Sequence, residues 1–111
     1  MADTGQVTPN PSVEVLADVD AIAALAWFVS IATPELAEVG FELEAQGRDW
    51  AHWTRGFRTV IRAYAFRREG DEGVRIHGQG DVPESVVADA ADKVVTVTGW
   101  RRGGSGKTGN E

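Results

Sequence analysis

The sequence predicts a helix-dominated α+β domain with a small sheet of two to three strands, and an all-α domain is the alternative. Three observations lead to this prediction. The chain has 111 residues, of which 42% are hydrophobic, and this size and composition suit one globular domain with its own core. Apolar residues recur at helical spacing through much of residues 18–68. β-Branched residues cluster in a few short runs, which is typical of strands.

The two ends of the chain differ in composition from the rest. Residues 1–12 and 103–111 are rich in Gly, Pro and polar residues and have no periodic apolar positions. Such composition is typical of flexible segments. We therefore place a flexible arm at 1–12, the globular domain at 13–102 and a flexible Gly-rich tail at 103–111.

A first helix is predicted to run to Ala32. Asp18 or Asp20 can cap its start, because an Asp side chain accepts hydrogen bonds from the free N–H groups of the first turn. The apolar residues that follow point in every direction around the helix axis. A helix that is apolar all round is typical of a segment buried on most sides, so we expect this helix at the centre of the fold.

A second helix is predicted over residues 34–46. Thr33 can serve as its N-cap, and Pro34 suits the first helical position, where its missing N–H costs nothing. Gly47 is a natural stop. Three glutamates would share one face of this helix.

A third helix is predicted over residues 50–68. The aromatic and β-branched residues between Trp50 and Tyr64 fall within an arc of roughly 100° at helical spacing. Asp49 can cap the start and Gly70 fits the end. Gly56 inside the segment costs about 1 kcal/mol relative to Ala.

Strands are predicted near residues 13–17, 74–78 and 94–100, and these make the small sheet. The run from Val94 to Thr98 is β-branched throughout, which favours a strand because such stiff side chains pack well on a sheet. A further helix is predicted to begin at Asp81–Pro83, between the last two strands.

Composition excludes several classes of protein. The chain has no cysteine, so disulfides and thiolate metal sites are excluded. Residues 1–10 carry no positive charge and no apolar core, so we expect no signal peptide. The longest apolar run, residues 22–32, is too short to cross a bilayer. We expect a cytoplasmic protein that does not engage a membrane.

The segment from Gly103 to Thr108, Gly-Gly-Ser-Gly-Lys-Thr, resembles part of a phosphate-binding loop. That loop needs a first Gly five residues before the Gly of Gly-Lys-Thr, and Arg101 stands there. It also needs a following helix to hold the phosphate, for which residues 109–111 are too few. We expect a solvated tail and no nucleotide site.

No catalytic residue, metal ligand or cofactor is predicted. The two histidines, His52 and His77, lack the further ligands that a zinc site needs. Ser30 and Ser85 do not lie in a Gly-x-Ser-x-Gly elbow. An enzyme with an unfamiliar site stays a third possibility, because a fold alone does not determine function.

Charge is distributed unevenly along the chain. Residues 1–47 hold eight acids and no Lys or Arg, whereas residues 48–68 hold six arginines and one acid. Within the chain, Glu38 or Glu42 could pair with Arg55 or Arg58. The same complementarity could instead join two copies of the chain, where opposite patches meet.

These observations predict a small non-enzymatic protein-interaction or oligomerising module, with a homodimer as one form. The alternative is a small nucleic-acid-binding regulatory protein that uses the Arg and aromatic residues of a helix over 48–68. The net charge of −6 favours a protein partner or self-association over nucleic acid. The candidate partner-binding residues are Arg48, Trp50, Trp53, Arg55, Arg58, Arg62 and Tyr64.

Overall fold

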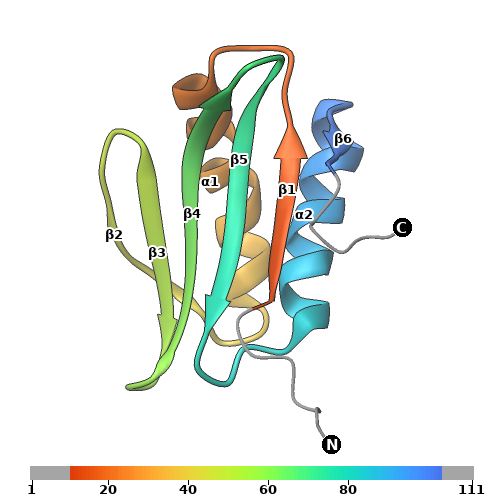
Figure 1. Cartoon of the computed structure of the whole chain (residues 1–111). Coiled ribbons are helices and arrows are strands. Elements are labelled where there is room, and N and C mark those ends of the chain that lie inside the picture. The colour runs from red at the N-terminus through yellow and green to blue at the C-terminus, as the bar shows by residue number, and fades with distance from the viewer. Residues whose placement is uncertain (1–10, 104–111) are drawn as a thin grey trace, which may run out of the picture.

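The structure, a computed structural model, describes residues 11–103 and contains an antiparallel sheet with two helices on one of its faces (Figure 1). The six strands lie in the order β2-β3-β4-β5-β1-β6. In chain order the elements are β1 (Ser12–Leu16), α1 (Ala21–Ala37), β2 (Glu42–Gln46), β3 (Trp50–Arg55), β4 (Thr59–Arg68), β5 (Asp71–Gln79), α2 (Glu84–Thr98) and β6 (Arg101–Arg102). More residues lie in strands than in helices. The predictions of a helix-dominated domain with two to three strands, and of an all-α domain, are therefore wrong.

Residues 50–68 form the β3–β4 hairpin instead of a helix. Gly56 adopts a φ of 75° in the connecting turn, a conformation that glycine takes without steric cost. The apolar side chains of the hairpin lie on both faces of the sheet: Trp53 is buried on one face, while Trp50 and Tyr64 lie on the other. A strand that is apolar on both faces loses the alternation that identifies a strand in a sequence.

Residues 34–46 do not form a second helix either. Helix α1 continues through Pro34 to Ala37, and the chain then turns into the edge strand β2. Pro34 removes only the N–H that would reach the carbonyl of Ser30. Ser30 is exposed, so water can satisfy that carbonyl. The prediction of a second helix over residues 34–46 is therefore wrong.

Thr33 connects α1 to the sheet instead of starting a helix. Its hydroxyl donates to the carbonyl of Val29 at 2.6 Å and accepts from the indole N–H of Trp53 at 3.0 Å. The Trp53 ring is fully buried and meets the ring of Phe28 edge-on, with 6.1 Å between centroids. A buried Trp needs a partner for its N–H, and Thr33 provides it from inside the helix.

Helix α1 begins as predicted but is less buried than predicted. Of the two proposed caps, Asp20 holds the position, because its carboxylate accepts from the N–H of Ile22 at 2.8 Å. Both helices lie behind the sheet in the view of Figure 1. The side of α1 away from the sheet is exposed, and Trp27 there is 58% exposed. The expectation of a central helix buried on most sides is therefore wrong.

The predicted strand at 94–100 belongs largely to helix α2. Four residues at helical spacing, Val87, Ala90, Ala91 and Val94, form the buried face of this helix. Their burial outweighs the small preference of β-branched residues for strands. The other two predicted strands are found: residues 13–17 overlap β1, and residues 74–78 lie within β5.

The hydrophobic core lies between the helices and the inner face of the sheet, which we define as the face that α1 and α2 cover. It is one cluster that joins both helices to the four central strands. Its members include Val13, Val15, Leu25, Phe28, Ala51, Trp53, Ile61, Ala63, Val74, Ile76, Val87 and Val94. The predicted arm up to residue 10 and the predicted tail after Gly103, which holds Gly-Lys-Thr at residues 106–108, lie outside the described residues.

Candidate interaction surface

The face of the sheet opposite the helices is not covered by any element that the structure describes (Figure 1). Successive side chains of a strand point to opposite faces, so the register of the strands tells which residues share this open face. Its central side chains come from β1, β3, β4 and β5. They are Glu14, Trp50, His52, Arg62, Tyr64, Phe66, Arg68, Arg75 and His77.

Two aromatic side chains stand side by side on the open face. Trp50 of β3 is the direct cross-strand partner of Tyr64 of β4, and each is 37% exposed. The Trp50 ring also lies 4.8 Å, centroid to centroid, from the imidazole of His52. Trp50 and Tyr64 therefore offer aromatic surface at a position where neighbouring strands hold it rigidly.

A row of basic side chains runs beside this aromatic pair. Arg62 of β4 lies between His52 of β3 and His77 of β5 in the register. Arg62 is exposed and forms no ion pair with the residues that the structure describes. Burial, followed by the charge of Arg62, lowers the pKa of His52. Arg62 is therefore a cationic group in this row that is free to meet an anion.

The arginines nearer β1 are already paired. Glu14 is buried and accepts two hydrogen bonds from Arg68, at 2.9 and 3.1 Å, and one from Arg75 at 2.5 Å. The hydrogen bonds from Arg68 hold the pKa of Glu14 below its ordinary value of 4.5. Burial opposes this effect, and the hydrogen bond from Arg75 adds to it. In return, Glu14 raises the pKa of both arginines. This half of the open face is an internal ion cluster.

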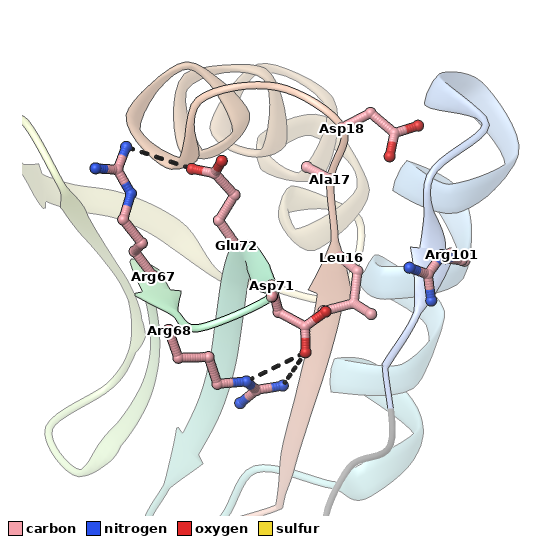
Figure 2. A pocket seen from close by; sticks show the side chains of 9 residues that line it. Leu16, Ala17, Asp18, Arg67, Arg68, Asp71, Glu72 and Arg101 are labelled. Carbon is pink, nitrogen blue, oxygen red and sulfur yellow. Dashed lines mark hydrogen bonds and ion pairs between the residues drawn. The ribbon is translucent and has the colours of Figure 1, made fainter.

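A pocket of about 360 Å³ lies at the end of the sheet near the β4–β5 turn (Figure 2). Arg67 and Arg68 line it, and each turns toward an acid of β5: Arg67 lies 3.5 Å from Glu72, and Arg68 lies 3.3 Å from Asp71. Its charges are therefore largely neutralised within the chain. Residues 11–103 also contain no cluster of three side chains able to hold a metal ion.

The structure divides the predicted partner-binding residues into three groups. Trp50, Arg62 and Tyr64 come together on the open face, while Trp53 is buried on the inner face. Arg55 leans over the ring of Phe41, 4.6 Å from its centroid, and donates to the carbonyl of Val39 at 3.0 Å. Arg48 and Arg58 lie in the turns at either end of β3. The ion pairs expected between Glu38 or Glu42 and Arg55 or Arg58 do not form among the described residues.

Sequence reasoning missed six residues of the open face: Glu14, His52, Phe66, Arg68, Arg75 and His77. Those of β1 and β5 become neighbours of the predicted residues only through strand pairing. The alternation along β3 and β4 is the signal in the sequence that could have revealed the other three, because residues two apart share a face of a strand.

The uneven charge along the sequence corresponds to a difference in charge between the helical layer and the sheet layer. The helical layer, residues 17–41 and 80–100, holds eight acids and one lysine. The strands and their turns, residues 12–16, 42–79 and 101–102, hold nine arginines and seven acids. One side of the molecule is therefore strongly acidic and the other weakly basic.

Comparisons with family models, curated proteins and solved structures return no significant match to this chain. Within residues 11–103, neither helix is long and apolar enough to cross a bilayer.

Proposed function

We propose that this protein is a cytoplasmic, non-enzymatic protein-interaction module whose open sheet face binds a protein surface of acidic and apolar character. The observation that carries the proposal is the exposed Trp50–Tyr64 pair beside Arg62, whose charge has no partner in the described part of the chain. The absence of cysteine removes the main argument for secretion.

Residue type and rigidity both support this function. Trp, Tyr and Arg are the side chains that most often dominate the energetics of protein interfaces. Trp50, Arg62 and Tyr64 lie on two paired strands near the middle of the sheet, so binding costs little ordering of the backbone. Arg62 favours a partner that offers a carboxylate, and the aromatic pair favours one that offers apolar surface.

Single-stranded nucleic acid is the second candidate ligand. Aromatic rings on an open antiparallel sheet can stack bases, and a neighbouring arginine can contact phosphates. We rank it second because the arginines toward β1 are committed to Glu14 and because seven acids accompany the nine arginines of the sheet layer. A helix over 48–68 has no part in this alternative, because those residues form a hairpin.

Amide chemical shifts of the labelled protein provide the test, with two designed amphipathic peptides as probes. Both peptides carry the same Leu/Ala stripe, and one has Glu where the other has Lys. We expect the Glu peptide to shift the amides of Trp50, Arg62 and Tyr64, and the Arg62→Glu variant to weaken that binding at least tenfold. Shifts confined to the helices, or equal binding of the Lys peptide, would contradict the proposal.

A thymidine oligonucleotide of about 20 residues tests the second candidate. Fluorescence anisotropy should show no binding at low salt. Tight binding that weakens steeply with salt, and that is lost on replacing Trp50 and Tyr64 by Ala, would establish nucleic acid as the ligand in place of protein.

A further inference from the structure

We propose that the partner of the open face is a second copy of this chain, which contributes the outer face of its helix α1. We define that outer face by its exposed residues Ile22, Ala23, Ala26, Trp27 and Ser30. The inference rests on the proposed function, because it names the partner of the same surface.

The outer face of α1 is not composed like a surface that faces water. Residues 21–34 contain no charged side chain, and Trp27 and Ile22 are exposed. A helix on the surface of a soluble domain ordinarily carries charged or polar residues on the side away from the core. The composition of α1 therefore fits a helix that is covered on both sides.

An acid marks the start of this apolar strip. Asp20, the N-cap of α1, is exposed and has only a loose ion pair with Arg67 at 3.6 Å. Exposed pairs of this kind contribute little, so this carboxylate can exchange partners when a second chain arrives. The acid near the other end of α1, Glu35, is half-buried and faces Lys93 of α2 at 3.8 Å, so it takes no part in the outer face.

Strand β4 carries the complementary pattern on the open face. Arg62, Tyr64 and Phe66 follow one another at every second residue, so the unpaired charge of Arg62 lies at one end of an aromatic row. The acid–apolar order of α1 therefore meets a base–aromatic order on β4. Arg68, further along β4, is bonded to Glu14 and Asp71 and is not required for the contact.

Sheet architecture supports the same arrangement. Within one chain, α1 already packs along β4 and β5 on the inner face. A second α1, supplied by a neighbouring copy, would give the sheet a helical layer on its open face as well. Such a layer would bury the exposed rings of Trp50 and Tyr64. The charge of the two sides, acidic on the helices and basic on the sheet, also favours their association.

A symmetric dimer through two α1 helices is disfavoured by charge. Such a dimer would bring two helical layers together, and each layer holds eight acids and one lysine. Like charges would then face each other across the interface. A head-to-tail contact between α1 and the open face avoids this repulsion, and because it uses two different surfaces it can continue from copy to copy.

Sedimentation velocity on the full chain, with two variants and a control, tests the proposal. Trp27→Glu disables the outer face of α1, Arg62→Glu disables the open face, and Val97→Glu alters an equally exposed apolar residue on α2. We expect the wild type and Val97→Glu to associate increasingly with concentration. Each of the other two variants should associate at least tenfold more weakly, and circular dichroism should show that both remain folded.

The decisive sample is the equimolar mixture of Trp27→Glu and Arg62→Glu. Its members still hold one intact α1 face and one intact open face between them, so we expect a heterodimer that grows no further. A mixture that stays monomeric, or a Trp27→Glu variant that associates like the wild type, would overturn the proposal. A wild type that is monomeric at every concentration would also overturn it, and binding of the Glu peptide described above would then leave the proposed function standing with a different partner.

Discussion

The two helices cover the same face of the sheet, yet their outer sides differ in chemistry. Helix α2 exposes Glu84, Asp89, Asp92 and Lys93, as expected for a helix in contact with water. Helix α1 exposes no charge between residues 21 and 34 and holds Trp27 in the middle of that stretch. Because both helices belong to one layer of one small domain, α2 serves as an internal reference for α1.

The difference is what we expect if solvent determines the outer face of α2 and the proposed partner determines the outer face of α1. Both helices are otherwise alike in length and in how they bury small and branched residues against the sheet. An exposed apolar patch that the core does not require is typical of an interaction site. Substitutions on the inner and outer sides of the helices should therefore have different effects.

The largest effect is expected on the inner side of α1. Phe28→Ala removes a fully buried ring that packs against Trp53, and we expect it to lower the free energy of unfolding by about 3–5 kcal/mol. Val94→Ala on the inner side of α2 should cost less, because fewer buried atoms are lost. Chemical denaturation measures both changes.

Trp27→Ala is the matched control on the outer side of α1. Its cost in the dilute, monomeric protein should stay within about 0.5 kcal/mol, as for other surface substitutions. A cost similar to that of Phe28→Ala would contradict the division of α1 into a structural side and a binding side.

A smaller effect is expected at the ion cluster of the open face. Folding lowers the pKa of Glu14, so its charged form stabilises the native state. That contribution is present above the unfolded pKa, near 4.5, and is lost as the pH falls through the lower folded pKa. Glu14→Gln should reduce the free energy of unfolding at neutral pH by about 1–3 kcal/mol.

The pH dependence distinguishes this cluster from the rest of the open face. Unfolding measured across the acidic range should show a flatter profile for Glu14→Gln than for the wild type. Glu42→Gln, at an exposed position on β2, should leave the profile unchanged. An unchanged profile for Glu14→Gln would mean that Arg68 and Arg75 do not stabilise the carboxylate.

The smallest effect is a dependence of thermal stability on protein concentration. Association that involves only the native state raises the melting temperature as concentration rises. We expect a rise of several degrees for the wild type and for Val97→Glu, corresponding to about 1 kcal/mol for a domain of this size. Trp27→Glu should melt at one temperature at all concentrations, and a rise equal to that of the wild type would argue against an interface on α1.

Local signals in the sequence predicted those parts of the fold that depend on local contacts. The cap at Asp20 and the strands near residues 13–17 and 74–78 depend on a few adjacent residues. The hairpin of residues 50–68 could not be recognised in this way. Its two strands are apolar on the inner face because of the core and on the open face because of Trp50 and Tyr64. The apolar residues of the two faces together give a sequence pattern that resembles helical spacing.

The candidate surface was predicted in part for a related reason. Trp50, Arg62 and Tyr64 are predicted from their residue types. Trp, Arg and Tyr are common at interfaces whether they lie on a helix or on a strand. Their neighbours His77 and Arg75 come from β5, more than ten residues further along the chain, and only strand pairing brings them near. The uncharged run in α1 was visible in the sequence, but burial in a core explains such a run equally well until the structure shows which side is exposed.

We propose that the outer face of α1 is an interface and that the outer face of α2 is not. Hydroxyl-radical footprinting distinguishes the two faces, because it reports the solvent access of Trp27 and Val97, which are 58% and 56% exposed, in the same sample. We expect the oxidation rate of Trp27 to fall as the protein is concentrated, while that of Val97 stays constant. A Trp27 rate that is the same in dilute and concentrated protein would show that no interface forms on α1.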